Sequence, residues 1–327
     1  MRIANKVLAF ASHLFGIDEL FYWLNRKAKR VLAFHNVLPD DLMCLYPHAG
    51  VVMSESAFRT IIREVKRRWP ISIDLDDPST LTLTFDDGYL NQYSIAGKIL
   101  KEEGNIPAIL FIAGNLLDAS SASQALVVDK LLHWVAGVPD GIVTQQGASS
   151  REELWQRVVR PAFARDSEGR GENALAAFDS VWPMAKIYER YSEEYLRLRL
   201  TGIPEACLDE LRGRGWRIGW HTKTHHPLSS LSPDAKTDEM MPPSGFKAEP
   251  FAYPYGELSS VDFSSIELAR RLGYPCAVSC ICTPNPFVGD YFIPRICLPA
   301  NTSEANFVLS GLKHFCKYGK LLSKSCR

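Results

Sequence analysis

Residues 81–88 read LTLTFDDG, and this stretch sets two adjacent carboxylates at the end of an apolar run. Leucine and phenylalanine alternate with threonine up to Phe85, which is the period of a half-buried β-strand. Asp86 and Asp87 follow, and Gly88 allows the backbone to turn sharply. Because adjacent carboxylates repel each other, a chain tolerates them at a strand end mainly where water or a metal ion offsets the charge. The alternative interpretation is an ordinary Asp-Asp-Gly turn.

A second apolar run leads into a group of histidines. Residues 216–220 read WRIGW, which is typical of another strand, and His221 and His225 follow four positions apart. On a turn of helix these two imidazoles would share one face. Two imidazoles and a carboxylate form a typical catalytic metal site with a fourth position open to water. The alternative is a surface loop that the histidines merely cap, but both clusters directly follow predicted strands, where α/β barrels place their sites.

The third motif is aromatic and rich in proline. Residues 250–256 read PFAYPYG, and a helical pattern follows at 264–272. Alone, this segment also fits a rigid surface loop with aromatic packing. In this order, however, Asp-Asp-Gly, His-Thr-x-x-His and Phe-Ala-Tyr-Pro-Tyr-Gly resemble the polysaccharide deacetylase family, the NodB homology domain of carbohydrate esterase family 4. The resemblance covers about residues 30–300.

The resemblance implies a fold and a function. The implied fold is a distorted, incomplete (β/α) barrel, and the pattern of strands joined by helices independently favours an α/β barrel. The implied function is a metal-dependent deacetylase that hydrolyses an N-acetyl or O-acetyl group on a polysaccharide or glycan precursor. Two alternatives stay open. One is hydrolysis of a non-sugar C–N amide bond on the same scaffold, and the other is a catalytically inactive carbohydrate-binding protein.

The resemblance also implies a role for each motif residue. Asp87, His221 and His225 would hold a divalent metal ion, expected to be Zn²⁺. Asp86 would act as the general base on water, and the backbone N–H of Tyr255 would be an oxyanion donor. A metal ion in such a ligand set polarises the acetyl carbonyl and lowers the pKa of its bound water toward about 7.

Two positions depart from the family pattern. Many members carry an arginine in the third motif that pairs with the base, and this chain has Ala252 there. Arg295, within the sequence IPRI, is predicted to replace that arginine from a neighbouring strand end. The family's last motif, Leu-x-His, supplies a general acid and matches only at 312–314. Because that stretch reads as a terminal helix, His314 is a poor candidate for the acid.

Substrate contacts are predicted at Tyr253, Pro254 and His35. Tyr253 and Tyr255 can stack against a sugar ring, although packing alone also explains such tyrosines. His35 ends the first predicted strand, and His226 is a further candidate for the pocket. The alternative is that these two histidines are structural, as histidines in such places more often are.

The chain divides into four parts on sequence patterns. Residues 1–30 are predicted to form an N-terminal helical segment, and residues 31–300 the deacetylase-like domain. A helical insertion is predicted at 116–200, because this part breaks the strand–loop–helix rhythm. Residues 301–327 are predicted to form a C-terminal helix.

Composition limits the partners and the compartment. Lys+Arg and Asp+Glu both number 37, so nothing suggests a nucleic-acid partner. The eight cysteines show no paired framework, which is typical of free thiols in a reducing cytosol. Residues 7–17 are mostly apolar but lack a clear cleavage site. We therefore expect a cytoplasmic protein, with weak peripheral association of segment 1–30 with the inner membrane surface.

Overall fold

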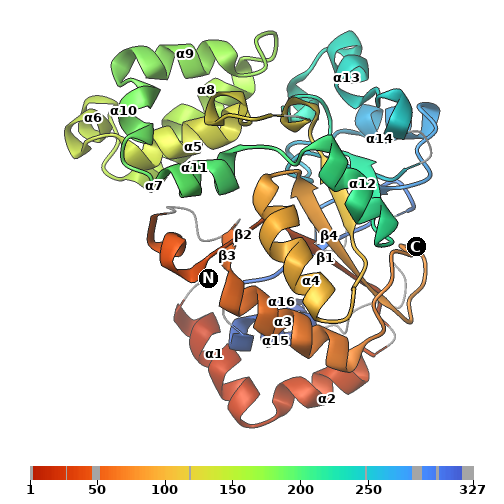
Figure 1. The fold of residues 1–327 in the computed structure, drawn as a ribbon. Coiled ribbons are helices and arrows are strands. Elements are labelled where there is room, and N and C mark those ends of the chain that lie inside the picture. The colour runs from red at the N-terminus through yellow and green to blue at the C-terminus, as the bar shows by residue number, and fades with distance from the viewer. Residues whose placement is uncertain are drawn as a thin grey trace.

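The fold centres on a parallel β-sheet of seven strands within the described part of the chain. The computed structural model describes residues 3–26, 28–45, 52–117, 119–246, 249–281, 289–299 and 302–318. The strand order is β8-β7-β6-β5-β4-β1-β9, and helices pack outside it (Figure 1). The strands are β1 (Arg30–Phe34), β4 (Leu81–Asp87), β5 (Ile109–Ile112), β6 (Arg217–Trp220), β7 (Phe251–Ala252), β8 (Ala277–Val278) and β9 (Ile296–Cys297).

One short segment reaches both edges of this sheet. Ile293 bridges to Val278 of β8 in parallel, and three residues later Ile296 pairs with Leu32 of β1. The sheet therefore curls toward closure, but through two-residue strands at each edge. This confirms the predicted distorted, incomplete barrel.

Strand β4 is buried on both faces, so the prediction of a half-buried strand is wrong. Its leucines and Phe85 face the helices, whereas Thr82 and Thr84 face the barrel interior. The buried hydroxyl of Thr84 donates a hydrogen bond of 2.8 Å to the Leu32 carbonyl, which offsets the cost of its desolvation. Apolar side chains also fill the interior: Val31, Ile109, Phe111, Ala252, Val278 and Ile293.

Helices cover the outer face of the barrel. The helix α3 begins after Ser54, whose hydroxyl accepts a hydrogen bond from the Ala57 N–H, and its apolar stripe packs on the sheet. The covering helices are α3 (Glu55–Arg68), α4 (Lys98–Glu102), α12 (Glu205–Gly213), α13 (Pro233–Met240) and α14 (Phe263–Arg271). A separate two-stranded parallel sheet pairs β2 (Asn36–Leu38) with β3 (Val52–Ser54).

A group of helices between β5 and α12 packs around its own apolar cluster, which includes Leu131, Trp134 and Phe178 (Figure 1, yellow to green). Its two ends meet where the N–H of Gly202 donates to the Ala119 carbonyl, 2.7 Å away. The main helices are α5 (Val127–Gly137), α6 (Asp140–Gln145), α7 (Arg151–Glu153), η5 (Leu154–Val159), α8 (Arg160–Arg165), α9 (Glu172–Val181), α10 (Met184–Tyr188) and α11 (Glu193–Leu200).

The two ends of the chain pack together at the base of Figure 1. The Tyr22 hydroxyl donates to Asn306 Oδ1 at 3.0 Å, and the Asn25 amide donates to the Ser310 carbonyl at 2.7 Å. The helices are α1 (Ile3–Leu14), α2 (Ile17–Leu24), α15 (Thr302–Leu309) and α16 (Leu312–Tyr318). His314 lies in α16 with its ring beside Tyr318. It therefore belongs to a terminal helix, as the sequence indicated.

Candidate active site

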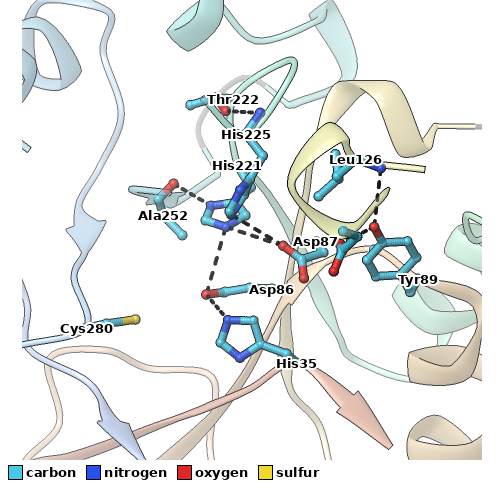
Figure 2. A network of polar contacts seen from close by, with 12 residues as sticks. His35, Asp86, Asp87, Tyr89, Leu126, His221, Thr222, His225, Ala252 and Cys280 are labelled. Carbon is cyan, nitrogen blue, oxygen red and sulfur yellow. Dashed lines mark hydrogen bonds and ion pairs between the residues drawn. The ribbon is translucent and has the colours of Figure 1, made fainter. Parts of the chain in front are cut away.

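Three predicted metal ligands meet at the C-terminal end of the barrel strands (Figure 2). Asp87 is the last residue of β4, His221 directly follows β6, and His225 lies in the loop after it. Asp87 Oδ1 lies 3.8 Å from His221 Nε2 and 3.5 Å from His225 Nε2. All three side chains are buried. The structure thus brings together residues that are up to 138 positions apart in the sequence.

These residues fit a divalent metal ion. Asp87 Oδ1 and His221 Nε2 are buried and have no hydrogen-bond partner among the described residues, which costs about 1–3 kcal/mol each. Donors bound tetrahedrally at zinc distances lie about 3.4 Å from one another, close to the spacings found here. Burial also lowers the pKa of His221 to about 3, so its imidazole is neutral, as a metal ligand must be.

The backbone of the site is unusual. Six described non-glycine residues have a positive φ, and four of them are at this site: Asp87 (83°), Thr222 (65°), His225 (61°) and Tyr255 (61°). Such conformations are unfavourable for these residue types and persist only where the surrounding structure imposes them. Their concentration here indicates a site built for a function.

The sequence spacing suggested a helical turn for His221 and His225, but the two histidines do not lie on one. Residues 221–227 form a loop, because Thr222 and His225 adopt left-handed conformations. The Thr222 hydroxyl accepts a hydrogen bond of 3.1 Å from the His225 N–H and closes this loop. Helical spacing and a closed loop both place the two imidazoles on one side, so the ligand prediction does not depend on the helix.

A buried carboxylate holds the histidine loop in place. Glu239, on α13, accepts hydrogen bonds from the Thr224 hydroxyl (2.7 Å), the Thr224 N–H (2.9 Å) and the Lys223 N–H (3.0 Å). Arg170 from the helical insertion donates to the same carboxylate at 3.0 Å. The sequence gives no signal for the role of Glu239, because an acid on a polar helix normally faces solvent.

Asp86 is held by the arginine that was predicted to replace the missing one. Arg295 donates two hydrogen bonds of 2.6 Å, one to each carboxylate oxygen of Asp86, and both side chains are buried. Arg295 also donates to the Ser279 carbonyl and to the Thr84 hydroxyl, each at 3.0 Å. Burial alone would raise the pKa of Asp86, but the charge and the hydrogen bonds of Arg295 hold it well below its usual range. Asp86 is therefore ionised.

His35 lies on the other side of Asp86. Its Nε2 is 3.8 Å from Asp86 Oδ2, and its side chain keeps 22% of its surface exposed (Figure 2). The Gln92 amide donates to the His35 carbonyl at 2.7 Å, and the Gln92 side-chain oxygen accepts from the Gly88 N–H at 3.1 Å. Gln92 begins a π-helical turn, a feature frequent at functional sites, and no signal in the sequence marked it.

The third motif divides between the site and the core. The Tyr255 ring packs edge-on against His225 at 4.8 Å, and the Tyr255 N–H donates to no other described residue. Gly256 makes this turn possible, since a Cβ there would lie 2.3 Å from the Cys280 nitrogen. Tyr253, by contrast, is fully buried on the helix-facing side of the sheet and donates to the Tyr291 carbonyl at 2.9 Å.

The predicted substrate contacts are therefore corrected in part. Tyr253 has no exposed surface for a sugar ring, so its prediction as a substrate-binding residue is wrong. Pro254 is buried as well. His226 is fully buried against Phe163, with ring centroids 4.8 Å apart, and acts as a packing residue. Aromatic residues in a proline-rich turn look alike in sequence whether they face a ligand or a core.

The helical insertion contributes a second buried network beside Asp87. The Tyr89 hydroxyl donates to Asp129, and Arg199 donates to the other oxygen of the same carboxylate. The Leu126 N–H donates to the Tyr89 oxygen at 3.3 Å (Figure 2). Burial, together with the charges of Asp129 and Asp86, raises the pKa of Asp87 to about 7. The insertion thus places a buried ion pair, Asp129 with Arg199, behind the site.

A pocket of about 450 Å³ opens beside the Tyr255 ring, between the insertion and the loops that carry the motifs. Arg160 on one side lies 3.6 Å from Glu257 on the other. The lining residues are Trp155, Gln156, Arg160, Pro161, Phe163, Ala164, Pro227, Ser229, Ser230, Tyr255, Ser259 and Ser260.

Comparison with known proteins defines the fold. The chain is similar to the Streptococcus pyogenes deacetylase PplD in complex with acetate, with 15% identity and a TM-score of 0.51 over 86% of this chain and 97% of that one. It is similar to a de-N-acetylase from Aggregatibacter actinomycetemcomitans, with 16% identity and a TM-score of 0.50 over 84% and 96% of the two chains. No protein-family profile and no curated protein sequence matches it. The chain has the fold of the polysaccharide deacetylases, as the sequence motifs implied.

Proposed function

We propose that this chain is a metal-dependent deacetylase that hydrolyses an N-acetyl or O-acetyl group on a polysaccharide or glycan precursor. The observation that carries the proposal is the buried Asp87–His221–His225 group beside the ionised Asp86–Arg295 pair. The fold supports it, because the two similar structures above are a deacetylase and a de-N-acetylase.

Asp87, His221 and His225 would hold the metal ion, and Zn²⁺ suits two neutral imidazoles and one carboxylate. When bound, a divalent ion would polarise the acetyl carbonyl and lower the pKa of water, so that even a weak base could accept its proton. The protein's own contribution is a fixed, dry set of donors, since each of the three side chains is at least nine-tenths buried.

Asp86 would accept the proton of the attacking water. Arg295 binds both Asp86 oxygens and fixes their direction, and each oxygen keeps a second lone pair for water. A low pKa makes Asp86 a weak base, so its role depends on the acidified water. General-base catalysis of this kind typically contributes about 10²–10⁴-fold in rate.

The remaining groups would contact the substrate. The Tyr255 N–H would be a donor to the developing oxyanion, because it donates to no other described residue. His35 reaches both Asp86 and solvent, which suits an imidazole that contacts the substrate. The sugar would occupy the pocket beside Tyr255, where aromatic rings and small polar side chains line the same space.

The proposal is tested by acetate release from acetylated oligosaccharides, with and without a chelator. We expect release that a chelator stops and that added zinc restores. Release from small amides but not from glycans would support the non-sugar amidohydrolase instead. Glycan binding without any acetate release would support the inactive carbohydrate-binding alternative.

Truncating the aromatic side of the pocket should separate sugar from non-sugar substrates. In Trp155→Ala we expect KM for an acetylated oligosaccharide to rise about tenfold with kcat nearly unchanged, because uniform binding is lost. Hydrolysis of a small acetate ester should not change. Trp182→Ala, a half-buried tryptophan of the same insertion outside the pocket, is the control. An equal loss on both substrates would show that the pocket does not hold the sugar.

A further inference from the structure

The surface of the described chain carries an unusual concentration of apolar side chains in its first two helices. Nine of the fourteen large apolar residues that are exposed lie between Val7 and Leu24. We call these nine the α1–α2 face: Val7, Leu8, Phe10, Leu14, Phe15, Ile17, Leu20, Trp23 and Leu24. Several are more than half exposed, with Phe15 at 75% and Phe10 at 63%. A soluble protein rarely exposes so many large apolar residues in one place unless the surface has a partner.

The spacing shows that this face is a continuous stripe on each helix. The stripe consists of Val7, Phe10 and Leu14 in α1, and of Ile17, Leu20 and Leu24 in α2. A surface helix of a soluble protein has the opposite pattern, with its polar face in water. Here the outward face is apolar, whereas the polar residues Ser12 and Asp18 are buried against the protein.

The inner sides of both helices are anchored, so the α1–α2 face cannot turn inward. Ala9 and Phe21 pack in one cluster with Phe307 and Leu312 of the C-terminal helices. The hydrogen bond from Tyr22 to Asn306 is buried and fixes the same contact. The apolar stripes are therefore presented outward by a packed base.

The exposed charges around the α1–α2 face are mainly positive. Lys6 is exposed on α1, 4.0 Å from Glu304, Arg26 is exposed just after the end of α2, and Lys313 and Lys317 are exposed on α16. The Arg26 guanidinium lies over the Trp23 ring, 4.7 Å from its centroid. A tryptophan beside cations is typical of the boundary between lipid tails and headgroups.

The two carboxylates of α1 and α2 do not oppose this charge. Asp18 is buried and lies 2.8 Å from His13 Nδ1. Glu19 forms an ion pair with Arg68. The charge presented with the apolar stripe therefore complements an anionic surface.

The described helices do not include one that is long and apolar enough to cross a bilayer. Residues 6–14 and 17–24 together have the length and composition, but the two helices meet at an angle of 88°. Such a bent, one-sided pair suits a position in the plane of the headgroup region rather than across the membrane.

We infer that the α1–α2 face docks on an anionic lipid surface. Its apolar side chains enter the boundary between headgroups and acyl chains, and the surrounding lysines and arginine contact lipid phosphates. Arg30, the first residue of β1, donates to the Leu309 and Asn25 carbonyls and ties these helices to the N-terminal end of the sheet. Asp86 and Asp87 lie at the opposite end of the adjacent parallel strand, so docking leaves the catalytic site clear of the lipid.

The test is co-sedimentation of the full chain with vesicles of phosphatidylcholine, with or without phosphatidylglycerol. We expect binding to the anionic vesicles that weakens at high salt and is poor for phosphatidylcholine alone. The double variant Phe10→Ser and Trp23→Ser should lose at least about tenfold in partitioning, because two large apolar groups no longer insert.

The matched control is Phe263→Ser, which alters a side chain with the same exposure as Phe10 (62% against 63%) on a different helix. Phe263→Ser should bind vesicles as well as the unaltered protein does. Both this control and the double variant should have the melting temperature of the unaltered protein. Absence of vesicle binding, or equal binding by the double variant, would overturn the inference. A third outcome would also overturn it: light scattering could show a dimer in the absence of lipid, and a monomer for the double variant. The α1–α2 face would then bind a second copy of the chain.

Discussion

Replacing His221 by alanine is expected to lower the bound metal from about one equivalent per chain to a small fraction. His221 Nε2 is a buried nitrogen without a hydrogen-bond partner among the described residues, and its loss leaves only Asp87 and His225 to hold the ion. Deacetylase activity should fall to the level of the chelated enzyme. Elemental analysis after dialysis measures the metal directly.

The neighbouring residue provides a matched control. His226 is as deeply buried as His221 but packs against Phe163 instead of facing Asp87. His226→Ala should therefore be less stable and yet retain metal. If His221→Ala keeps its metal, the ligand assignment is wrong. If both variants lose metal equally, the loss reflects a misfolded loop rather than a missing ligand.

The second large effect concerns the base. Asp86→Asn should keep the metal and lose about 10²–10⁴-fold in kcat, because the proton acceptor is gone while the three ligands stay. The substitution also leaves the Arg295 guanidinium buried without its counter-charge, which typically costs about 3–5 kcal/mol. We therefore expect a lower melting temperature together with the loss of rate.

A charge-balanced double variant separates these two effects. Asp86→Asn with Arg295→Gln removes both charges of the pair and should recover most of the lost stability. It should remain inactive, because neither substitution restores a base. Recovery of activity in the double variant would show that Asp86 only neutralises Arg295. Loss of metal in Asp86→Asn would instead place Asp86 among the ligands.

Much of this site could be predicted because its residues stand next to strand ends. The aspartates end one strand and His221 directly follows another, and in a parallel barrel these ends meet at one rim. The substitution of Arg295 for the missing family arginine could also be predicted, since a short apolar run carries it to a neighbouring strand end. Residues at strand ends, and an arginine near such an end, can therefore be recognised in the sequence.

Other parts of the site left no such signal. Glu239 supports the histidine loop from α13, and Asp129 approaches Asp87 from the insertion, each as an ordinary acid in a helix. Their roles arise from long-range packing rather than from a local pattern. The prediction for Tyr253 failed for a related reason: this tyrosine directly follows a two-residue strand, and the alternation of that strand decides whether it faces the pocket or the core. A change of one position exchanges the two faces.

The ion pair between Arg295 and Asp86 also bears on when the site is completed during synthesis. Its partners are 209 positions apart, and Arg295 belongs to the segment that joins both edges of the sheet. A growing chain emerges from the N-terminus, so Asp86 is made long before its counter-charge. Contacts of such high sequence separation form late and slowly. The nascent protein would therefore have its proposed metal ligands before its proposed base is ordered, and we expect activity only after the last strand has joined the barrel.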